Sequence, residues 1–209
     1  MNPPVNLRRE RLFWHEQITV CGVDEAGRGP LAGPVVAAAV ILPFDFKVLG
    51  LDDSKKLSAK EREKYFATVS KCAVAVGVGI VTHREIDRIN IHQASLKAMR
   101  LAVEQLSVPV DQVLLDGRFT IPNLKAAAGG KPVAQNAIVG GDRKSASIAA
   151  ASVIAKVTRD RIMLELDEQY PQYGFKQHKG YGTKAHFAAI KRHGLSPVHR
   201  KSFCGSVLK

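Results

Sequence analysis

The sequence predicts an α/β fold in which a mixed central sheet is flanked by helices. The chain has 209 residues, of which 45% are hydrophobic, so it can bury a full core and is most simply one domain. Short runs rich in Val, Ile and Ala, mostly bounded by Gly or Pro, are typical of strands. Longer segments in which apolar residues recur every three or four positions indicate helices.

The first half of the chain predicts three strands that precede the longest helices. Residues 18–23 and 35–42 are apolar runs separated by a stretch rich in glycine and proline. Residues 59–70 have helical periodicity, and residues 73–81 form the third apolar run. A longer helical pattern follows at residues 91–106. This order favours an antiparallel meander of the first three strands.

In the second half, predicted strands alternate with predicted helices. Residues 113–115 and 134–139 are apolar runs, and the stretch between them, residues 117–131, is the most irregular part of the sequence. Helical periodicity returns at residues 148–170 and 183–193. Together the two halves predict a mixed sheet with helices packed on it.

The sequence has no segment that is typical of a membrane protein or a secreted protein. The longest purely apolar run, residues 35–42, is far shorter than a membrane-spanning helix. Residues 1–10 lack the apolar core of a signal peptide. We therefore expect a cytoplasmic protein that does not bind a membrane, and we expect a monomer.

Charge is concentrated at the C-terminal end. Lys and Arg exceed Asp and Glu by 12 in the whole chain, and residues 169–209 contain no acidic residue at all. A segment of one sign predicts a polyanionic partner, of which nucleic acid is the commonest. An anionic membrane surface and simple solubility are the alternatives. Pro171, Gly174 and Pro197 argue against a long amphipathic helix and so against the membrane.

Two adjacent carboxylates, Asp24 and Glu25, follow the first predicted strand directly. Burying them would cost roughly several kcal/mol unless a cation binds them. A divalent ion is therefore a candidate ligand. Gly27, Arg28 and Gly29 then offer backbone N–H groups and a guanidinium, which are phosphate-binding groups. A solvated turn is the alternative. Because neighbouring strand residues point to opposite faces, a shared site would require the strand to end or bend between the carboxylates.

Two further acidic residues occupy positions that a shared site would need. Asp116 ends a predicted strand, and Asp142 precedes a predicted helix. The alternative role for Asp142 is a helix N-cap. Carboxylates brought to one sheet edge from three segments would form an oxygen-rich site, which suits Mg²⁺ or Mn²⁺ rather than zinc.

Several long motifs resemble those of bacterial ribonuclease HII, in order along nearly the whole chain. The first is Gly22-Val-Asp-Glu-Ala-Gly-Arg-Gly-Pro-Leu-Ala-Gly33, which contains the carboxylate pair. The others are Asp53-Ser-Lys-Lys-Leu57, Glu85-Ile-Asp-Arg-Ile-Asn-Ile91, Leu115-Asp-Gly117, Ala149-Ala-Ala-Ser-Val-Ile-Ala-Lys-Val-Thr-Arg-Asp160, His178-Lys-Gly-Tyr181 and His199-Arg-Lys-Ser-Phe203.

The resemblance implies a ribonuclease H-like fold with a small C-terminal helical segment. It also implies an endoribonuclease that hydrolyses the RNA strand of RNA/DNA hybrids and nicks duplex DNA at embedded ribonucleotides, with two Mn²⁺ or Mg²⁺ ions. On this basis residues 1–16 are an N-terminal extension, residues 17–170 the catalytic domain and residues 171–209 a basic substrate-binding segment. The extension is expected either to contact the duplex or to pack on the domain.

The resemblance also implies roles for individual residues. The catalytic and metal-binding carboxylates match Asp24, Glu25, Asp116 and Asp142. Contacts to the ribonucleotide and its 2′-hydroxyl match Gly27, Arg28 and Gly29, and Tyr181 matches a tyrosine that stacks on the next deoxyribose. The expected phosphate contacts are Lys55, Lys56, Lys144, Lys179 and Lys184. Two-metal hydrolysis by water would leave a 3′-hydroxyl and a 5′-phosphate.

Three other functions fit parts of the sequence. Gly27, Gly29 and Ala32 match a dinucleotide-binding fingerprint, but the strand-like run that follows stands where this fingerprint needs a helix. A non-catalytic nucleic-acid binder would explain the basic segment and leave the carboxylates unexplained. Other two-metal nucleases, such as junction resolvases and integrases, share the acidic cluster.

Lys156 and Asp160, one helical turn apart, predict a structural ion pair.

Overall fold

The central element is a five-stranded mixed sheet with the strand order β3-β2-β1-β4-β5. The structure is a computed structural model that describes residues 5–47, 57–125 and 132–205. Neighbouring strands are antiparallel from β3 to β1 and parallel from β1 to β5. The predicted mixed sheet is therefore confirmed, including the antiparallel meander of its first three strands. The strands are β1 (Val20–Ala26), β2 (Val35–Ile41), β3 (Ala75–Val81), β4 (Gln112–Asp116) and β5 (Ala134–Ile138).

The α-helices include the four predicted ones and two that periodicity did not predict, α1 and α5. They are α1 (Arg8–Trp14), α2 (Ala59–Cys72), α3 (His83–Glu104), α4 (Ala146–Gln169), α5 (Phe175–His178) and α6 (Lys184–His193). Helix α3 begins at His83, earlier than predicted, because a first helical part precedes a break at Asn90, where φ is 65°. Its apolar periodicity starts only after this break. Strand β2 follows the glycine-rich stretch, which contradicts a dinucleotide-binding unit.

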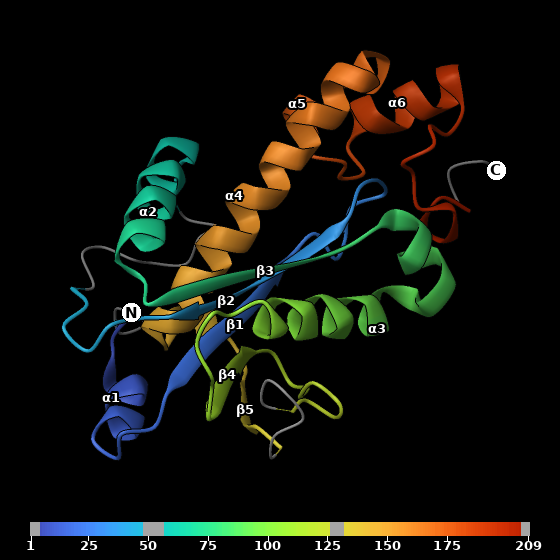
Figure 1. The fold of residues 1–209 in the computed structure, drawn as a ribbon. Coiled ribbons are helices and arrows are strands. Elements are labelled where there is room, and N and C mark those ends of the chain that lie inside the picture. Colours follow the sequence, from blue (N-terminus) through green and yellow to red (C-terminus); the bar gives the residue numbers. More distant parts are fainter. Residues whose placement is uncertain (1–4, 48–56, 126–131, 206–209) are drawn as a thin grey trace.

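Helices cover both faces of the sheet (Figure 1), and each face has its own core. Helix α3 packs on β2 and β3, and α4 packs on β1 and β2 on the other face, with α2 lying against α4. The α4 contact is so close that a Cβ on Gly22 would lie 2.1 Å from the backbone of Ser147. Close packing thus fixes α4 over β1, the strand that carries Asp24 and Glu25.

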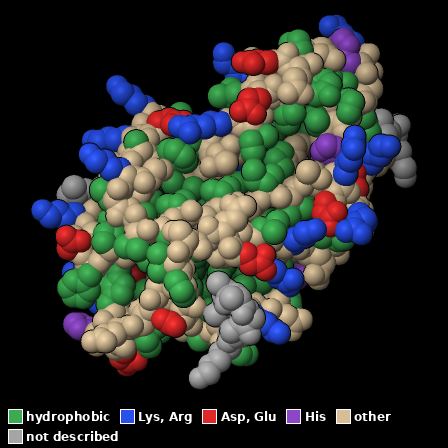
Figure 2. Space-filling model, viewed as in Figure 1, with side chains coloured by type: hydrophobic (Ala, Val, Ile, Leu, Met, Phe, Trp, Pro, Cys, Tyr) green, Lys and Arg blue, Asp and Glu red, His purple; other side chains and the backbone are tan. Residues whose placement is uncertain are grey.

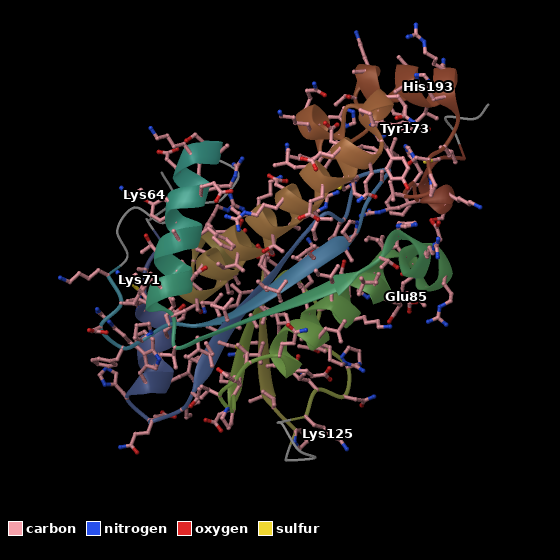
Figure 3. All side chains as sticks on the ribbon, turned by 45° about the horizontal axis from the view of Figure 1, so that its top comes forward. Lys64, Lys71, Glu85, Lys125, Tyr173 and His193 are labelled. Carbon is pink, nitrogen blue, oxygen red and sulfur yellow. The ribbon has the colours of Figure 1, made fainter. Side chains whose placement is uncertain are left out.

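The C-terminal segment forms a smaller cluster at the far end of α4. Met163 of α4 is buried there against Tyr173, Phe175 and Ile190. Figure 3 shows Tyr173 and His193 together in this segment, beyond the end of the sheet. A β-bridge between Ala32 and His199 ties the segment to the loop that follows β1. Within the described ranges, no helix is long and apolar enough to cross a membrane.

The N-terminal helix packs on the domain. Glu10 of α1 is fully buried at the N-terminus of α4. Its Oε1 accepts hydrogen bonds from Ser145 Oγ at 2.6 Å and from Ser147 N and Oγ at 2.9 and 2.7 Å. A carboxylate at a helix N-terminus is also favoured by the helix dipole. Glu10 therefore anchors α1 to α4.

Replacing Glu10 with Ala is expected to lower the free energy of unfolding by about 3 kcal/mol, because buried donors of Ser145 and Ser147 lose their acceptor. Urea denaturation followed by circular dichroism measures the change. The exposed Glu16 provides the control, and Glu16→Ala should change stability by less than about 0.5 kcal/mol. Equal stabilities of the two variants would contradict the anchoring role of Glu10.

Candidate active site

The sheet opens at the C-terminal ends of β1 and β4. Their parallel pairing ends at Val23 and Leu115, and the next residues are Asp24 and Asp116. Beyond these residues the two strands no longer pair, and side chains meet in the opening between them. A pocket of about 250 Å³ lies there. It is lined by Asp24, Glu25, Ala26, Gly27, Arg28, Gly29, Asp116, Ser152, Lys156, Arg159 and Tyr181.

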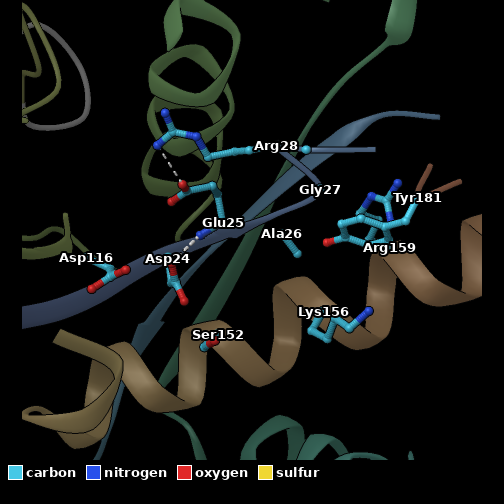
Figure 4. Close-up of a pocket in the computed structure, with 11 residues that line it drawn as sticks. Asp24, Glu25, Ala26, Gly27, Arg28, Asp116, Ser152, Lys156, Arg159 and Tyr181 are labelled. Atoms are coloured by element: carbon cyan, nitrogen blue, oxygen red, sulfur yellow. Dashed lines mark hydrogen bonds and ion pairs between the residues drawn. The ribbon is translucent and has the colours of Figure 1, made fainter. Parts of the chain in front are cut away.

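Asp24 and Glu25 both line the pocket although they point in opposite directions. Figure 4 shows the Asp24 carboxylate directed toward Ser152 of α4, and the Glu25 carboxylate on the other side of β1 beside Arg28. Arg28 Nη1 lies 3.1 Å from Glu25 Oε1. The expectation that the strand would end or bend between them is wrong, because β1 continues to Ala26 with regular pairing to β2. The pocket surrounds the edge of the strand and so reaches both faces.

Burial and like charge raise the affinity of these carboxylates for a cation. Asp24 is 6% exposed, and burial raises its pKa, with further contributions from the nearby charges of Glu25 and Asp116. Burial also raises the pKa of Glu25, although the Arg28 guanidinium opposes this shift. Asp116 Oδ1 accepts a hydrogen bond from the Gly141 backbone N–H at 2.6 Å. The carboxylates thus lie close together, and the Arg28 guanidinium forms an ion pair with Glu25.

Asp142 lies beside this cluster, in the turn that holds Asp116. It belongs to a 3₁₀ turn (Gly141–Arg143), is 4% exposed, and has Arg143 Nε 3.8 Å from its Oδ1. The alternative role as N-cap of α4 is wrong, because Ser145 caps that helix through a hydrogen bond from Ile148 N. Asp142 is not among the residues that line the pocket.

The carboxylate oxygens of this site suit a hard divalent cation that is also bound by a substrate phosphate. No three His, Cys, Asp or Glu side chains within the described residues are arranged to hold a metal by themselves. Mg²⁺ is commonly bound by one or two carboxylates together with waters and substrate phosphates. Asp24, Glu25 and Asp116 provide such carboxylates beside a phosphate-sized opening.

Two buried arginines hold the loop that follows β1. Arg200 donates hydrogen bonds to the carbonyl oxygens of Gly27 at 2.6 Å and Arg28 at 2.9 Å. Arg159 donates to those of Ala32 and Pro34 at 3.2 and 3.1 Å. In a trans peptide the N–H points away from the carbonyl, so the N–H groups of residues 28 and 29 point away from Arg200. Both residues line the pocket, where these N–H groups can meet a ligand.

Gly27 is required for this arrangement. Its φ is +96°, and a Cβ there would lie 2.1 Å from Arg159 Nε. A side chain would therefore both strain the backbone and displace the guanidinium. Burial lowers the pKa of Arg200 to about 9, with the nearby charge of Arg159 adding to the shift. Backbone carbonyls accept hydrogen bonds from each nitrogen of the Arg200 guanidinium, and from Nε and Nη2 of Arg159, which compensates for their burial.

These two arginines are the main site-forming residues that sequence reasoning missed. Both lie in motifs that carry the family resemblance, but the sequence alone assigns neither of them a role in the site. The available signal was spacing, because Arg159 continues the buried face of α4 marked by Ser152, Ala155 and Met163. A charged residue at a core position of an amphipathic helix indicates a specific buried partner.

Tyr181 faces the loop from the opposite wall of the pocket. It is 45% exposed, its ring lies 5.9 Å from the Arg159 guanidinium carbon, and a Cβ on Gly29 would be 3.8 Å from its Cε1. Lys156 lines the pocket between α4 and this ring and forms the predicted ion pair with Asp160 at 2.7 Å. The pocket thus has an acidic end and a basic, aromatic end.

Among the described residues, Lys144, Lys179 and Lys184 were expected to contact phosphates and do not line the pocket. Lys144 Nζ donates to the carbonyl of Val139 at 2.6 Å, and Lys179 Nζ donates to the carbonyl of Lys176. Lys184 is exposed at the start of α6. Lys55 and Lys56 lie outside the described residues.

Comparisons with known proteins agree over nearly the whole chain. The family model described as Ribonuclease HII matches residues 21–206. The ribonuclease HII of Geobacter metallireducens is 59% identical over 187 residues, which cover 89% of this chain and 84% of that protein. The ribonuclease HII of Geobacillus kaustophilus is 57% identical over 198 residues, covering 94% of this chain and 73% of that protein.

Solved structures give the same fold. The ribonuclease H2 from Pyrococcus horikoshii OT3 has a TM-score of 0.74 and 29% identity, covering 88% of this chain and 93% of that one. Bst-RNase HIII in complex with Mn²⁺ has a TM-score of 0.64 at 16% identity, covering 89% of this chain and 67% of that one, and supports the fold alone.

Replacing Asp24 with Asn is expected to stabilise the metal-free protein by about 1 kcal/mol at pH 8, because it removes a buried, repelled charge. The sign follows from the raised pKa: the folded state binds the proton more tightly than the unfolded state, so ionisation above the ordinary pKa destabilises the fold. Thermal unfolding in chelator measures this, and the exposed Asp45→Asn is the control. A lower Tm for Asp24→Asn than for the wild type would contradict the electrostatic account.

Proposed function

The chain belongs to the ribonuclease HII family, and from this premise we propose that it hydrolyses the RNA strand of RNA/DNA hybrids and nicks duplex DNA on the 5′ side of embedded ribonucleotides. Its cellular role would be ribonucleotide removal from DNA. One observation carries this proposal: the carboxylates at the open end of β1 and β4 share a pocket with the Gly27–Gly29 loop and Tyr181. Phosphate hydrolysis and sugar recognition would then take place in one pocket.

Asp24, Glu25 and Asp116 are the proposed metal-binding and catalytic carboxylates, with Asp142 completing the set from the adjoining turn. Mn²⁺ or Mg²⁺ would suit these oxygen donors. When bound, a pair of such ions lowers the pKa of the attacking water and stabilises the leaving oxygen. Water as the nucleophile makes the products a 3′-hydroxyl and a 5′-phosphate, with no cyclic phosphate formed from the 2′-hydroxyl.

The other end of the pocket would recognise the ribose. Backbone N–H groups of Arg28 and Gly29, held outward by Arg200, supply fixed donors to the ribonucleotide and its 2′-hydroxyl. Tyr181 would stack on the sugar of the following nucleotide. Because backbone donors cannot rotate away, a nucleotide lacking the 2′-hydroxyl would leave part of this donor set unpaired.

Basic side chains would bind the flanking duplex without reading its sequence. Lys144, Lys179, Lys184 and the segment 171–209 are proposed phosphate contacts outside the pocket, and Lys156 is proposed as one within it. Figure 2 shows Lys and Arg side chains along both margins of one face of the molecule. This distribution suits an elongated polyanion that extends beyond the pocket.

The proposal separates this chain from two rival functions. A non-catalytic binder has no use for three carboxylates at the open end of a sheet, where burial raises the pKa of Asp24 and of Glu25. A junction resolvase would share the carboxylates, but it has no need for a tyrosine and a glycine loop that line the same pocket.

A DNA duplex with one embedded ribonucleotide tests the function, in Mn²⁺, Mg²⁺ or chelator. We expect a metal-dependent nick on the 5′ side of the ribonucleotide, with a 3′-hydroxyl on the upstream DNA and a 5′-phosphate on the ribonucleotide, and no nick in an all-DNA duplex. Asp116→Asn should reduce kcat by about 100-fold or more while changing Kd less than about threefold, because it removes a reacting-centre carboxylate and no duplex contact.

Two outcomes would contradict the proposal. Nicking that persists in chelator would exclude the carboxylate chemistry. Binding of the duplex by the wild type without any cleavage would favour the non-catalytic binder.

A further inference from the structure

A chain of hydrogen bonds lies behind Tyr181, in a cluster that the proposed chemistry does not use. His186 of α6 and His199 are 0% and 2% exposed, and their Nε2 atoms are 3.0 Å apart. At one end, His186 Nδ1 lies 2.9 Å from the carbonyl oxygen of Tyr181. At the other end, His199 Nδ1 lies 2.9 Å from the backbone N of Ser196. The pair therefore connects Tyr181, which lines the pocket, to a separate C-terminal segment that contains Ser196.

The direction of each bond follows from the two ends of the chain. A backbone N–H only donates, so His199 Nδ1 accepts, and the proton of the neutral ring lies on its Nε2. A carbonyl oxygen only accepts, so His186 Nδ1 carries the proton of that ring. His199 Nε2–H therefore donates to His186 Nε2. The geometry fits one arrangement of protons, in which both imidazoles are neutral and have opposite tautomers.

An added proton would break a bond of this chain wherever it is placed. A second proton on His199 Nδ1 would face the Ser196 N–H and break that bond, leaving Ser196 Oγ, 2.7 Å away, as its acceptor. A second proton on His186 would face the His199 N–H. The surroundings include no carboxylate that would stabilise an imidazolium among the groups that face the pair in the described residues. Those groups are His178, stacked on His186 at 4.3 Å, Tyr173, whose ring lies 5.0 Å from that of His199, and His83. Burial accordingly lowers the pKa of His199 to about 4.

The histidine pair joins two segments that both hold the loop after β1. The carbonyl of Gly180 accepts a hydrogen bond from Leu31 N at 2.8 Å. On the other side, Gly33 N donates to the carbonyl of Val198 at 3.0 Å. Residues 178–181 and 196–200 therefore hold the loop from two sides, and the pair links these two segments. Neither imidazole lines the pocket.

We propose that His186 and His199 are positioning residues that hold Tyr181 opposite the Gly27–Gly29 loop, and that recognition of the ribonucleotide requires both imidazoles to be neutral. The inference rests on the proposed function, since Tyr181 acts there as the sugar-stacking residue. It adds two residues that touch neither substrate nor metal and act through the backbone of Tyr181. Acidification would then weaken substrate binding separately from its effect on the carboxylates.

His186→Phe and His186→Asn test the positioning role. Phe removes both hydrogen bonds, whereas Asn keeps an N–H that can reach the Tyr181 carbonyl. At pH 8 we expect the KM for the single-ribonucleotide duplex to rise about tenfold in His186→Phe, with kcat changed less than about threefold, and to be largely restored in His186→Asn. The control is His15→Asn, an exposed histidine outside segment 171–209, which should leave both constants unchanged.

A second readout does not depend on cleavage. The ¹⁵N shifts of the imidazoles in the wild type should show a proton on Nδ1 of His186 and on Nε2 of His199 at pH 7.5, with the pKa of each ring below the ordinary value for histidine. The lowered pKa of His199 also predicts stability that is present above about pH 6.5 and lost as the pH falls toward about 4, because the unfolded state then binds more protons. This loss should be smaller in His186→Asn, because the charge of His186 no longer contributes to lowering the pKa of His199.

The outcomes separate the two proposals. A wild type that does not nick the ribonucleotide duplex would overturn the proposed function and with it the role in recognition, while the ¹⁵N shifts would still test the chain of bonds. A wild type that nicks, with an unchanged KM in folded His186→Phe, would overturn the positioning role alone. If His186→Phe does not fold, two other results would overturn the positioning role. One is an Nε2 proton on His186 in the wild type. The other is a KM defect in His186→Asn that equals the defect in a His186→Gln variant.

Discussion

The arrangement of this pocket depends on two guanidinium groups that are buried beneath it. Arg159 and Arg200 are 1% and 0% exposed, and they bind backbone carbonyls of the loop between β1 and β2. Burying two cations side by side is unfavourable, as the lowered pKa of Arg200 shows, and the carbonyls of the loop compensate for it. The loop therefore cannot rearrange without exposing or orphaning a charge. Its outward N–H groups are fixed as a consequence.

This constraint connects elements that are distant in the sequence. Arg159 comes from α4, whose close packing over Gly22 also places Ser152 beside Asp24. Arg200 comes from the C-terminal segment, which carries Tyr181 and the histidine pair. The acidic end of the pocket is thus built on the splayed ends of β1 and β4, and its opposite end on the arginine-held loop. The helix α4 spans both, and Glu10 anchors its N-terminus.

The sequence predicted the acidic end better than the opposite end, for a physical reason. Asp24 and Asp116 each follow a run of strand-forming residues, and parallel strands end at a common edge, so local patterns were enough to bring them together. Arg159 and Arg200 act through backbone carbonyls far away in the chain, and a carbonyl leaves no mark in a sequence. The same is true of His186 and His199, whose partners are each other, the Ser196 hydroxyl and two backbone groups. Asp142 could not be distinguished from an N-cap until Ser145 was seen to cap α4.

Arg200→Lys tests the central claim most directly, because it keeps the charge and removes the geometry that binds several carbonyls at once. The measurement pairs kcat/KM on the single-ribonucleotide duplex with the increase in Tm that Mn²⁺ produces. If the arginines hold the recognition loop, kcat/KM should fall at least about tenfold while the Mn²⁺-dependent increase in Tm is kept, since the carboxylates lie at the other end of the pocket. An unchanged kcat/KM, or loss of the Mn²⁺ effect together with activity, would contradict the account.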